Sequence, residues 1–226
     1  MEVLIEVLLM QVDIRPFKPS DASELQRAVL NSVGHISPWL DWCTPRYSLS
    51  DARDWVCESI DLWAQGLAFR WVIVGKARRD FLGCVEICMS TCEEHVGQMG
   101  YWVRRQAIGQ GVCSQGAAQA LDWAFNSLDL QRVELFVQPS NDASIGVAHK
   151  LGAELIDQQH DQIFYNGQSQ VANRYQIEAD SSAWADLVPA RRRRWPLMPE
   201  YPNGTGDRLS AGSEASYEFR SSAKKA

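Results

Sequence analysis

Short runs rich in the β-branched and aromatic residues that favour β-strands recur along most of the chain, and residues 132–138 also alternate between apolar and polar positions. The runs cover residues 12–17, 69–74, 81–89, 100–103, 132–138, 153–157 and 164–177. A polar stretch from Lys76 to Asp80 separates the second run from the third. These two strands are therefore expected to pair as a hairpin.

Between the strands, apolar residues recur at the 3.6-residue spacing of amphipathic helices. Ser50 is expected to cap one helix, which Gly66 ends, and Asn141 to open another, because these residue types are favoured at those positions. Asp21 and Glu24 have capping-box spacing at the start of the first helix. The spacing predicts helices over about 21–31, 50–66, 112–128 and 141–152.

Antiparallel strands come first and two strand-to-helix units follow, which predicts an α/β domain with a mixed, mostly antiparallel central sheet flanked by helices. We expect residues 1–11 to be a loose N-terminal extension, in which Met10 is an alternative start. Residues 12–180 are expected to form the single domain. The segment 181–226 lacks apolar periodicity and is rich in Ser, Gly, Pro and charge, so it is expected to be a disordered tail.

Composition places the chain among globular proteins, since 46% of its 226 residues are hydrophobic and nine are Trp. Six Cys are too few for a disulfide framework at this length, and a reducing cytoplasm is the expected location. The apolar stretch from Val3 to Met10 is too short to cross a bilayer. No membrane partner is therefore expected.

Charge is distributed unevenly around the net value of -6. After residue 180, eight basic residues face five acidic ones, so the acidity belongs to the body of the chain. An acidic body argues against a nucleic-acid-binding domain and suits an amine partner. The run Arg191 to Arg194 is expected to be a solvated patch, with contact to nucleic acid or the ribosome as the alternative.

The stretch from Gly100 to Val112 carries the most chemical information, because a strand there runs into a glycine-bearing loop that opens a long helix. Such a turn directs backbone N–H groups and the positive end of the helix dipole toward one point, where a diphosphate fits. Gly109 and Gly111 allow a close backbone approach. A dinucleotide-binding fingerprint is excluded, because its third Gly would fall at Ser114.

The pattern Gln106-x-x-Gly109-x-Gly111 resembles the pyrophosphate loop of acetyl-CoA-dependent N-acetyltransferases of the GNAT superfamily. About thirty residues later, Asn141-x-x-Ser144 and the Leu-Gly pair that ends at Gly152 resemble the family's next helix, with Ala replacing the usual Phe after that pair. Together with 14–16 and the Pro-Trp-Leu-Asp-Trp stretch 38–42, the chain is similar to the RimJ/RimL-type branch over 12–177.

The resemblance implies acetyl transfer from acetyl-CoA, a cosubstrate, to a primary amine by direct attack in a ternary complex. The acceptor would be the N-terminal α-amino group of a protein or peptide, or a small-molecule amine. Two splayed strands would hold the pantetheine arm. The cofactor-binding residues implied are Val103, Arg105, Gln106, Ala107, Ile108, Gly109, Gln110, Gly111 and Asn141.

Catalytic groups are assigned from two kinds of evidence. In the family-derived reading, Ser144 lies near the sulfur and protonates the leaving thiolate, while Asn141 contacts the cofactor arm unless it serves only as an N-cap. Glu86 is the candidate general base, because it alternates with apolar neighbours in a strand near the expected cleft. Many relatives carry an acidic residue where this chain has Gln98, which keeps a catalytically silent CoA-binding sensor or interaction module as the alternative function.

Two aromatic residues are assigned to the acceptor. Trp39 and Trp42 lie after the first predicted helix, where they form an aromatic wall for a side chain or cation, or else belong to the core. No metal is expected, because the four-residue spacing of Cys84, Cys88 and Cys92 is not that of a zinc site. A monomer or a homodimer is expected.

Overall fold

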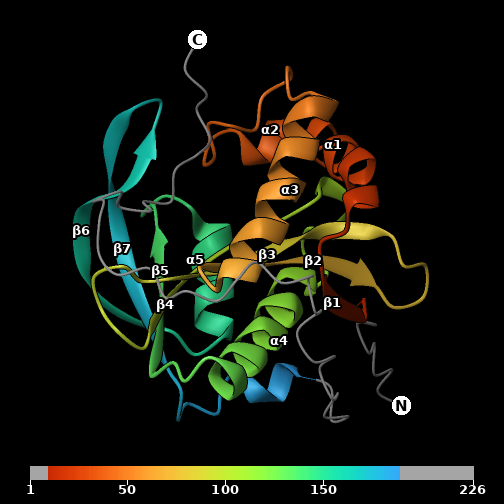
Figure 1. Ribbon diagram of the computed structural model, residues 1–226. Coiled ribbons are helices and arrows are strands. Elements are labelled where there is room, and N and C mark those ends of the chain that lie inside the picture. The colour runs from red at the N-terminus through yellow and green to blue at the C-terminus, as the bar shows by residue number, and fades with distance from the viewer. Residues whose placement is uncertain (1–9, 189–226) are drawn as a thin grey trace, which may run out of the picture.

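A seven-stranded sheet forms the centre of the protein in the computed structural model, which describes residues 10–188 (Figure 1). Its strand order is β1-β2-β3-β4-β5-β7-β6. Only β4 and β5 pair in parallel, which confirms the mixed, mostly antiparallel sheet. The strands are β1 (Val12–Pro16), β2 (Ala68–Gly75), β3 (Phe81–Met89), β4 (Val96–Val103), β5 (Arg132–Val137), β6 (Glu154–Tyr165) and β7 (Gln168–Glu178).

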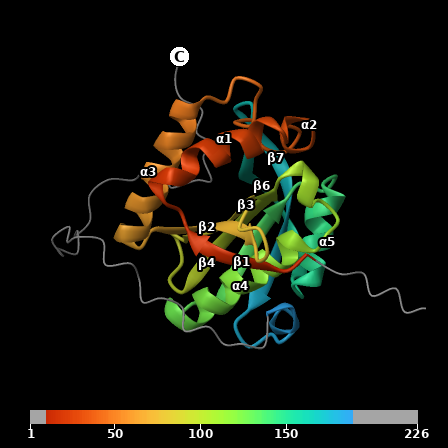
Figure 2. The same cartoon turned by 90° about the vertical axis from the view of Figure 1, so that its right-hand side faces the viewer.

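Helices cover both faces of the sheet, as the two perpendicular views show (Figures 1 and 2). On one face α1 packs on β3 and α3 on β2, while α4 crosses β1, β2 and β3 on the other. The helices are α1 (Ala22–Leu30), α2 (Val33–Ile36), α3 (Leu49–Gln65), α4 (Val112–Ser127) and α5 (Asp142–Lys150). Short 3-10 turns occupy Pro19–Asp21, Arg105–Ala107 and Ala185–Leu187. No helix within 10–188 is long and apolar enough to cross a membrane.

Helix ends follow local capping chemistry, with two corrections to the expected positions. The side chain of Asp21 forms no capping box with Glu24, because it accepts from Lys18 N at 2.8 Å and pairs with Arg15. Ser48, rather than Ser50, caps α3, because its side chain accepts from Asp51 N at 3.1 Å while Asp51 accepts from Ser48 N. The helix ends at Gly66, whose φ of 70° lies in the left-handed region, as expected. The two ends fix how far α3 extends across the sheet.

Four aromatic rings meet where the end of α3, β2 and α4 come together. Trp63, Phe69, Trp71 and Trp123 are buried, and Trp123 lies 4.9 to 5.5 Å from each of the other three ring centroids. Trp63 also meets Trp71 edge-on at 5.1 Å. Large rings bury much apolar area each, so this cluster joins α4 firmly to the sheet.

The sheet divides between β4 and β5. These strands pair only where Val96–Gln98 face Arg132–Glu134. Beyond that point β4 continues to pair with β3 as far as Val103, and β5 with β7 as far as Val137. The two strands therefore separate toward their carboxyl ends and leave a gap in the sheet.

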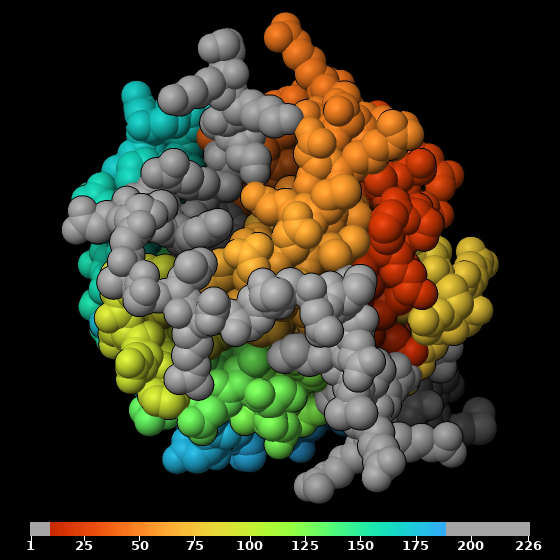
Figure 3. Space-filling view, in the orientation of Figure 1, coloured from red at the N-terminus to blue at the C-terminus, as the bar shows by residue number. Residues whose placement is uncertain are grey.

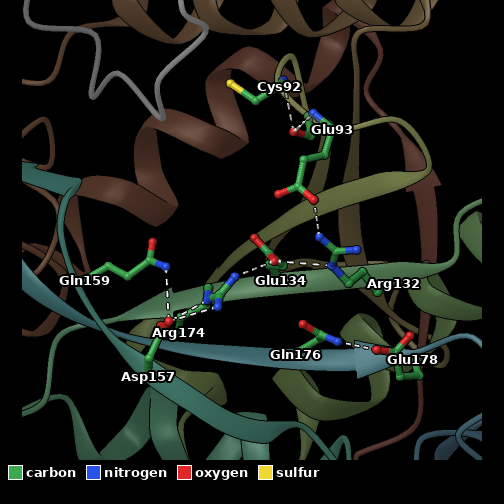
Figure 4. A network of polar contacts seen from close by, with 10 residues as sticks. Cys92, Glu93, Arg132, Glu134, Asp157, Gln159, Arg174, Gln176 and Glu178 are labelled. Carbon is green, nitrogen blue, oxygen red and sulfur yellow. Dashed lines mark hydrogen bonds and ion pairs between the residues drawn. The ribbon is translucent and has the colours of Figure 1, made fainter.

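Charged side chains form a network beside the gap, at the end of the sheet where β4 and β5 still pair (Figure 4). Glu134 on β5 accepts from Arg132 at 3.4 Å and from Arg174 on β7 at 3.3 Å. Arg174 also binds Asp157 on β6 at 2.9 Å, and Arg132 binds Glu93 in the loop before β4. The network connects β5, β6, β7 and that loop where β4 and β5 still pair.

Residues 1–9 and 189–226, with the run Arg191 to Arg194, lie outside the described residues, so the structure describes only a small part of the expected extension and tail. The segment 181–188, assigned from sequence to the tail, lies against α4 (Figure 3). Its Trp184 is buried against Phe125, with ring centroids 5.7 Å apart. Trp184, Leu187 and Val188 are too few to produce an apolar period in the sequence. They nevertheless pack one short helical turn against the hydrophobic core. Met10 also belongs to the fold, since its carbonyl accepts from Gln115 at 3.0 Å.

The last two strands form one long hairpin, which the sequence analysis divided differently. Phe164 lies in β6, which ends at Tyr165, instead of starting β7, and the chain reverses at Asn166 and Gly167, whose φ values are both positive. Asn-Gly is a favoured two-residue hairpin turn. The hairpin tip reaches the segment after α2, where Tyr165 donates to Ser37 O at 2.9 Å.

Candidate active site

A cavity of about 610 Å³ occupies the gap between β4 and β5. Residues from α2 and the following loop, β4, the start of α4, β5, α5 and the end of β6 line it. The predicted site residues among its walls are Trp39, Val103, Ala107, Ile108, Gly109, Gly111, Asn141 and Ser144. Glu86, Trp42, Arg105, Gln106 and Gln110 are not among the lining residues.

The glycine loop borders one end of the cavity. Gly109 and Gly111 have φ values of 75° and 71°, which only glycine adopts readily, and Gly111 is the N-cap of α4. An added Cβ at Gly109 would meet no atom within 4 Å. The first turn of a helix carries N–H groups without intrahelical acceptors. The loop therefore offers open space beside backbone donors and a positive helix end.

Some of the backbone amides assigned to this loop are already bonded. Arg105 N donates to Ser32 Oγ at 3.1 Å, and Ala107 N donates to Arg104 O at 2.8 Å. Ile108 N donates to Arg105 O at 3.4 Å. Gly109, Gly111 and the first turn of α4 are thus the backbone donors that remain beside the cavity.

A histidine from α2 reaches the carboxyl end of β4, where the glycine loop begins. Its ring nitrogen His35 Nε2 lies 2.9 Å from Val103 O. Because a carbonyl only accepts hydrogen bonds, Nε2 carries the proton. Nδ1 of the same ring is buried and has no partner within the described residues. His35 lines the cavity and was not singled out from the sequence.

Ser144 forms a hydroxyl pair with a tyrosine across the cavity. Asn141 Oδ1 accepts from Ser144 N at 3.1 Å, which confirms that Asn141 caps α5. Ser144 Oγ donates to Tyr101 Oη at 3.3 Å, and Tyr101 Oη donates to Ser144 O at 3.1 Å. Burial raises the pKa of Tyr101 well above its usual range, so its phenol stays protonated.

Glu86 lies in an ion pair outside the cavity. Its carboxylate accepts from Arg70 Nε at 2.8 Å, and both side chains are 14% exposed. Arg70 also binds Glu58 at 2.8 Å and lies over the Trp55 ring at 4.5 Å. Burial alone would lower the pKa of Arg70, but the two carboxylates raise it above its usual value. This geometry favours a structural role for Glu86.

The aromatic residues expected at the acceptor lie at different depths. Trp39 lines the cavity, whereas Trp42 packs behind it against Trp102, with ring centroids 6.2 Å apart. Trp102 itself lines the cavity. Trp39 and Trp102 are therefore the tryptophans that line the cavity, and Trp42 packs against Trp102.

Further polar residues border the cavity without having been assigned a role. Gln98 lines it from β4. Asp41 lines it from the loop after α2, and its Oδ2 accepts from Asn166 N at 3.0 Å. Cys113 lies at the start of α4, where burial raises its pKa to about 12. Among residues 10–188 no three ligating side chains are grouped for a metal ion.

The acetyltransferase (GNAT) domain matches this chain over residues 11–154. The chain belongs to the GNAT acetyltransferase family. The match begins one residue before β1 and ends at the start of β6, so it includes the cavity walls from α2, β4, α4, β5 and α5. The family assignment from the glycine loop is thereby confirmed.

Sequence relatives of this GNAT chain include the uncharacterized N-acetyltransferase p20 of Bacillus licheniformis, which is 32% identical over 108 residues. That alignment covers 48% of this chain and 61% of p20, so the chain spans less than two thirds of this relative.

Solved GNAT structures share the fold. RimJ of Mycobacterium smegmatis, in complex with CoA-disulfide, is 25% identical with a TM-score of 0.69, and the match covers 78% of this chain and 87% of RimJ. Spermidine N-acetyltransferase of Vibrio cholerae, in complex with CoA and spermine, is 19% identical with a TM-score of 0.61, covering 77% and 98%. CoA is thus a ligand of proteins with this architecture.

Proposed function

We propose that this protein transfers the acetyl group of acetyl-CoA to a primary amine by direct attack in a ternary complex. The observation that carries the proposal is the cavity at the division between β4 and β5, with the glycine loop at one end and a hydroxyl pair in its wall. Acetyl-CoA supplies the activated acetyl group. The chain supplies orientation, which accounts for a large part of such rate enhancements.

The residues around the cavity suit a CoA molecule. Gly109 and Gly111, with the first turn of α4, would hold the pyrophosphate, because they combine open space with backbone donors. The free edge of β4 near Val103 would lie along the pantetheine arm. Arg105 and Ala107 would shape the loop through their own hydrogen bonds.

Ser144 is proposed to deliver the proton that the leaving sulfur needs. Its hydroxyl lies in the cavity wall and is bonded to Tyr101, whose phenol remains protonated. Ser144 Oγ donates to Tyr101 Oη at 3.3 Å, and this hydrogen bond holds the serine hydroxyl at the cavity wall. Tyr101 therefore acts as a positioning residue in this proposal.

The acceptor is proposed to be a protein or peptide N-terminus or a small-molecule amine. Trp39 and Trp102 form an apolar and aromatic wall, and Asp41 adds negative charge to it. Both features suit an ammonium group beside a hydrophobic body. The structurally similar spermidine N-acetyltransferase, solved with CoA and spermine, supports an amine acceptor.

The test is release of free thiol from acetyl-CoA when a panel of amines and N-terminal peptides is added. Thiol release that depends on one amine, with the acetylated amine identified by mass, is the expected result. Stoichiometric CoA binding without acetylation of any amine would favour the silent CoA-binding module. Absence of CoA binding would overturn the proposal.

A further inference from the structure

Two acceptor atoms of the cavity wall are buried and have no partner. Among residues 10–188, the buried side-chain nitrogen or oxygen atoms without a hydrogen-bond partner are His35 Nδ1, Asp41 Oδ1, Trp63 Nε1 and Trp184 Nε1. The two indole nitrogens belong to the packed core, whereas His35 and Asp41 line the cavity. A buried polar atom left without a partner is costly, so such an atom at a cavity points to a ligand.

The tautomer of the neutral His35 ring follows from its one hydrogen bond. Nε2 donates to Val103 O at 2.9 Å, which leaves Nδ1 of the neutral ring with a lone pair. The same bond orients the ring and would strengthen once the ring became cationic. Nδ1 is therefore the nitrogen of this tautomer that can accept a hydrogen bond.

Asp41 offers the complementary charge. Its Oδ2 is held by Asn166 N at 3.0 Å, at the tip of the β6–β7 hairpin, while Oδ1 is the atom without a partner. The anchored carboxylate is thereby fixed in orientation at the cavity wall. Both unpartnered atoms are hydrogen-bond acceptors, so they match a ligand that brings donors and positive charge.

We propose that His35 Nδ1 takes the proton from the acceptor amine and that Asp41 Oδ1 binds the positive charge of the same acceptor molecule. This inference rests on the proposed acetyl transfer and makes the acceptor a cationic primary amine. The ammonium group gives one proton to Nδ1, and the freed lone pair bonds to the thioester carbonyl carbon. The C–S bond breaks with its electron pair on sulfur, the sulfur takes the hydroxyl proton of Ser144, and the nitrogen returns its second proton to Ser144.

His35 as the general base accounts for a chain that has Gln98 where many relatives have an acidic residue. Gln98 cannot accept a proton, and the carboxylate of Glu86 is bound to Arg70 outside the cavity. The other titratable groups that line the cavity are Asp41, Tyr101, Cys113, Asp142 and Lys150. Burial keeps Tyr101 and Cys113 protonated near neutral pH, so neither can serve as the base.

The test of His35 is the variant His35→Gln, whose amide can still donate to Val103 O but has no basic nitrogen. We expect a loss of about a hundredfold to ten-thousandfold in kcat, loss of the acidic limb of the pH–rate profile, and CoA affinity within about twofold of wild type. His160→Gln, at an exposed position on β6, is the matched control. A near-wild-type rate in His35→Gln would overturn the assignment.

Asp41→Asn keeps the size of the side chain and removes its charge. We expect the KM of the amine to rise by about tenfold to a hundredfold with a smaller change in kcat, whereas Asp61→Asn on the exposed side of α3 leaves both unchanged. An unchanged KM in Asp41→Asn would remove Asp41 from the acceptor site.

A readout without turnover tests the state of His35 separately from the proposed function. Nitrogen NMR distinguishes the two neutral tautomers of an imidazole, and the chain has only four His, so the His35 signals can be assigned by their loss in His35→Gln. The expected spectrum above neutral pH shows His35 protonated at Nε2 and free at Nδ1. Protonation at Nδ1 would refute the inference even if acetyl transfer were observed.

Discussion

Replacing Gly109 by Asn and by Asp separates backbone strain from charge at the glycine loop. Gly109 has a φ of 75°, and a new side chain there enters open space beside the cavity. Asn and Asp have nearly the same size, and both tolerate the left-handed region better than other residues. The two variants therefore share the strain of about 1–2 kcal/mol and differ only in one negative charge.

The charge sets the expected difference in affinity. A carboxylate about 5 Å from one phosphate charge is repelled by about 1–3 kcal/mol for effective dielectric constants between bulk water and the protein surface. A middle value of about 2 kcal/mol corresponds to a ~30-fold weaker Kd for CoA in Gly109→Asp than in Gly109→Asn. Screening reduces the difference as salt is raised.

Calorimetric titration of CoA at low and high salt measures both effects. Gly167→Asp is the matched control, because Gly167 has a φ of 73°, also meets open space, and lies in the β6–β7 turn away from the glycine loop. The control should lose stability but keep its CoA affinity. Equal affinities in Gly109→Asp and Gly109→Asn, with both proteins folded, would show that no phosphate lies beside this loop.

Three further outcomes are expected. Glu86→Gln leaves Arg70 with one carboxylate and should lower the free energy of unfolding by about 1–3 kcal/mol and Tm by about 3–10 °C. Its acetyl-transfer rate should be retained. A rate loss of a hundredfold at unchanged stability would restore Glu86 as the general base. Ser144→Ala should slow acetyl transfer by about a hundredfold or more while CoA affinity stays the same, whereas weaker CoA binding would make Ser144 a cofactor contact. Iodoacetamide at pH 8 should label exposed Cys57 rapidly but Cys113 slowly, because burial raises the pKa of Cys113 to about 12 and leaves about one thiolate in ten thousand. Labelling of Cys113 should rise about tenfold per pH unit. Equal labelling rates of the two cysteines at pH 8 would contradict the burial of Cys113.

Local signals were sufficient for the glycine loop and its helix. Gly109 and Gly111 are needed where φ is positive, and that requirement is visible in the residue types themselves. The Ser48 cap of α3 was missed by two residues, although Ser48 and Asp51 together form a capping box. The turn at Asn166 was also readable from its Asn-Gly pair.

Other features of the site depend on contacts between distant segments. His35 meets Val103 across 68 positions of the chain, and Asn166 meets Asp41 across 125, so neither pair has a local pattern. Glu86 is opposite Arg70 only because of the register between β2 and β3, which shifts within that strand pair. Strand alternation indicates that Glu86 lies on one face of the sheet. It does not indicate that Arg70 lies opposite and binds its carboxylate.

The aromatic cluster at the end of α3 also determines how the protein will absorb and emit light. Trp63, Trp71 and Trp123 lie within 5.1 to 5.5 Å of one another, so their excited states are coupled and should dominate the near-ultraviolet circular dichroism of the folded chain. None of the three lines the cavity, whereas Trp39 and Trp102 do. Loss of the coupled bands will therefore report separation of α4 from the sheet, while quenching of emission by a ligand will report on Trp39 and Trp102.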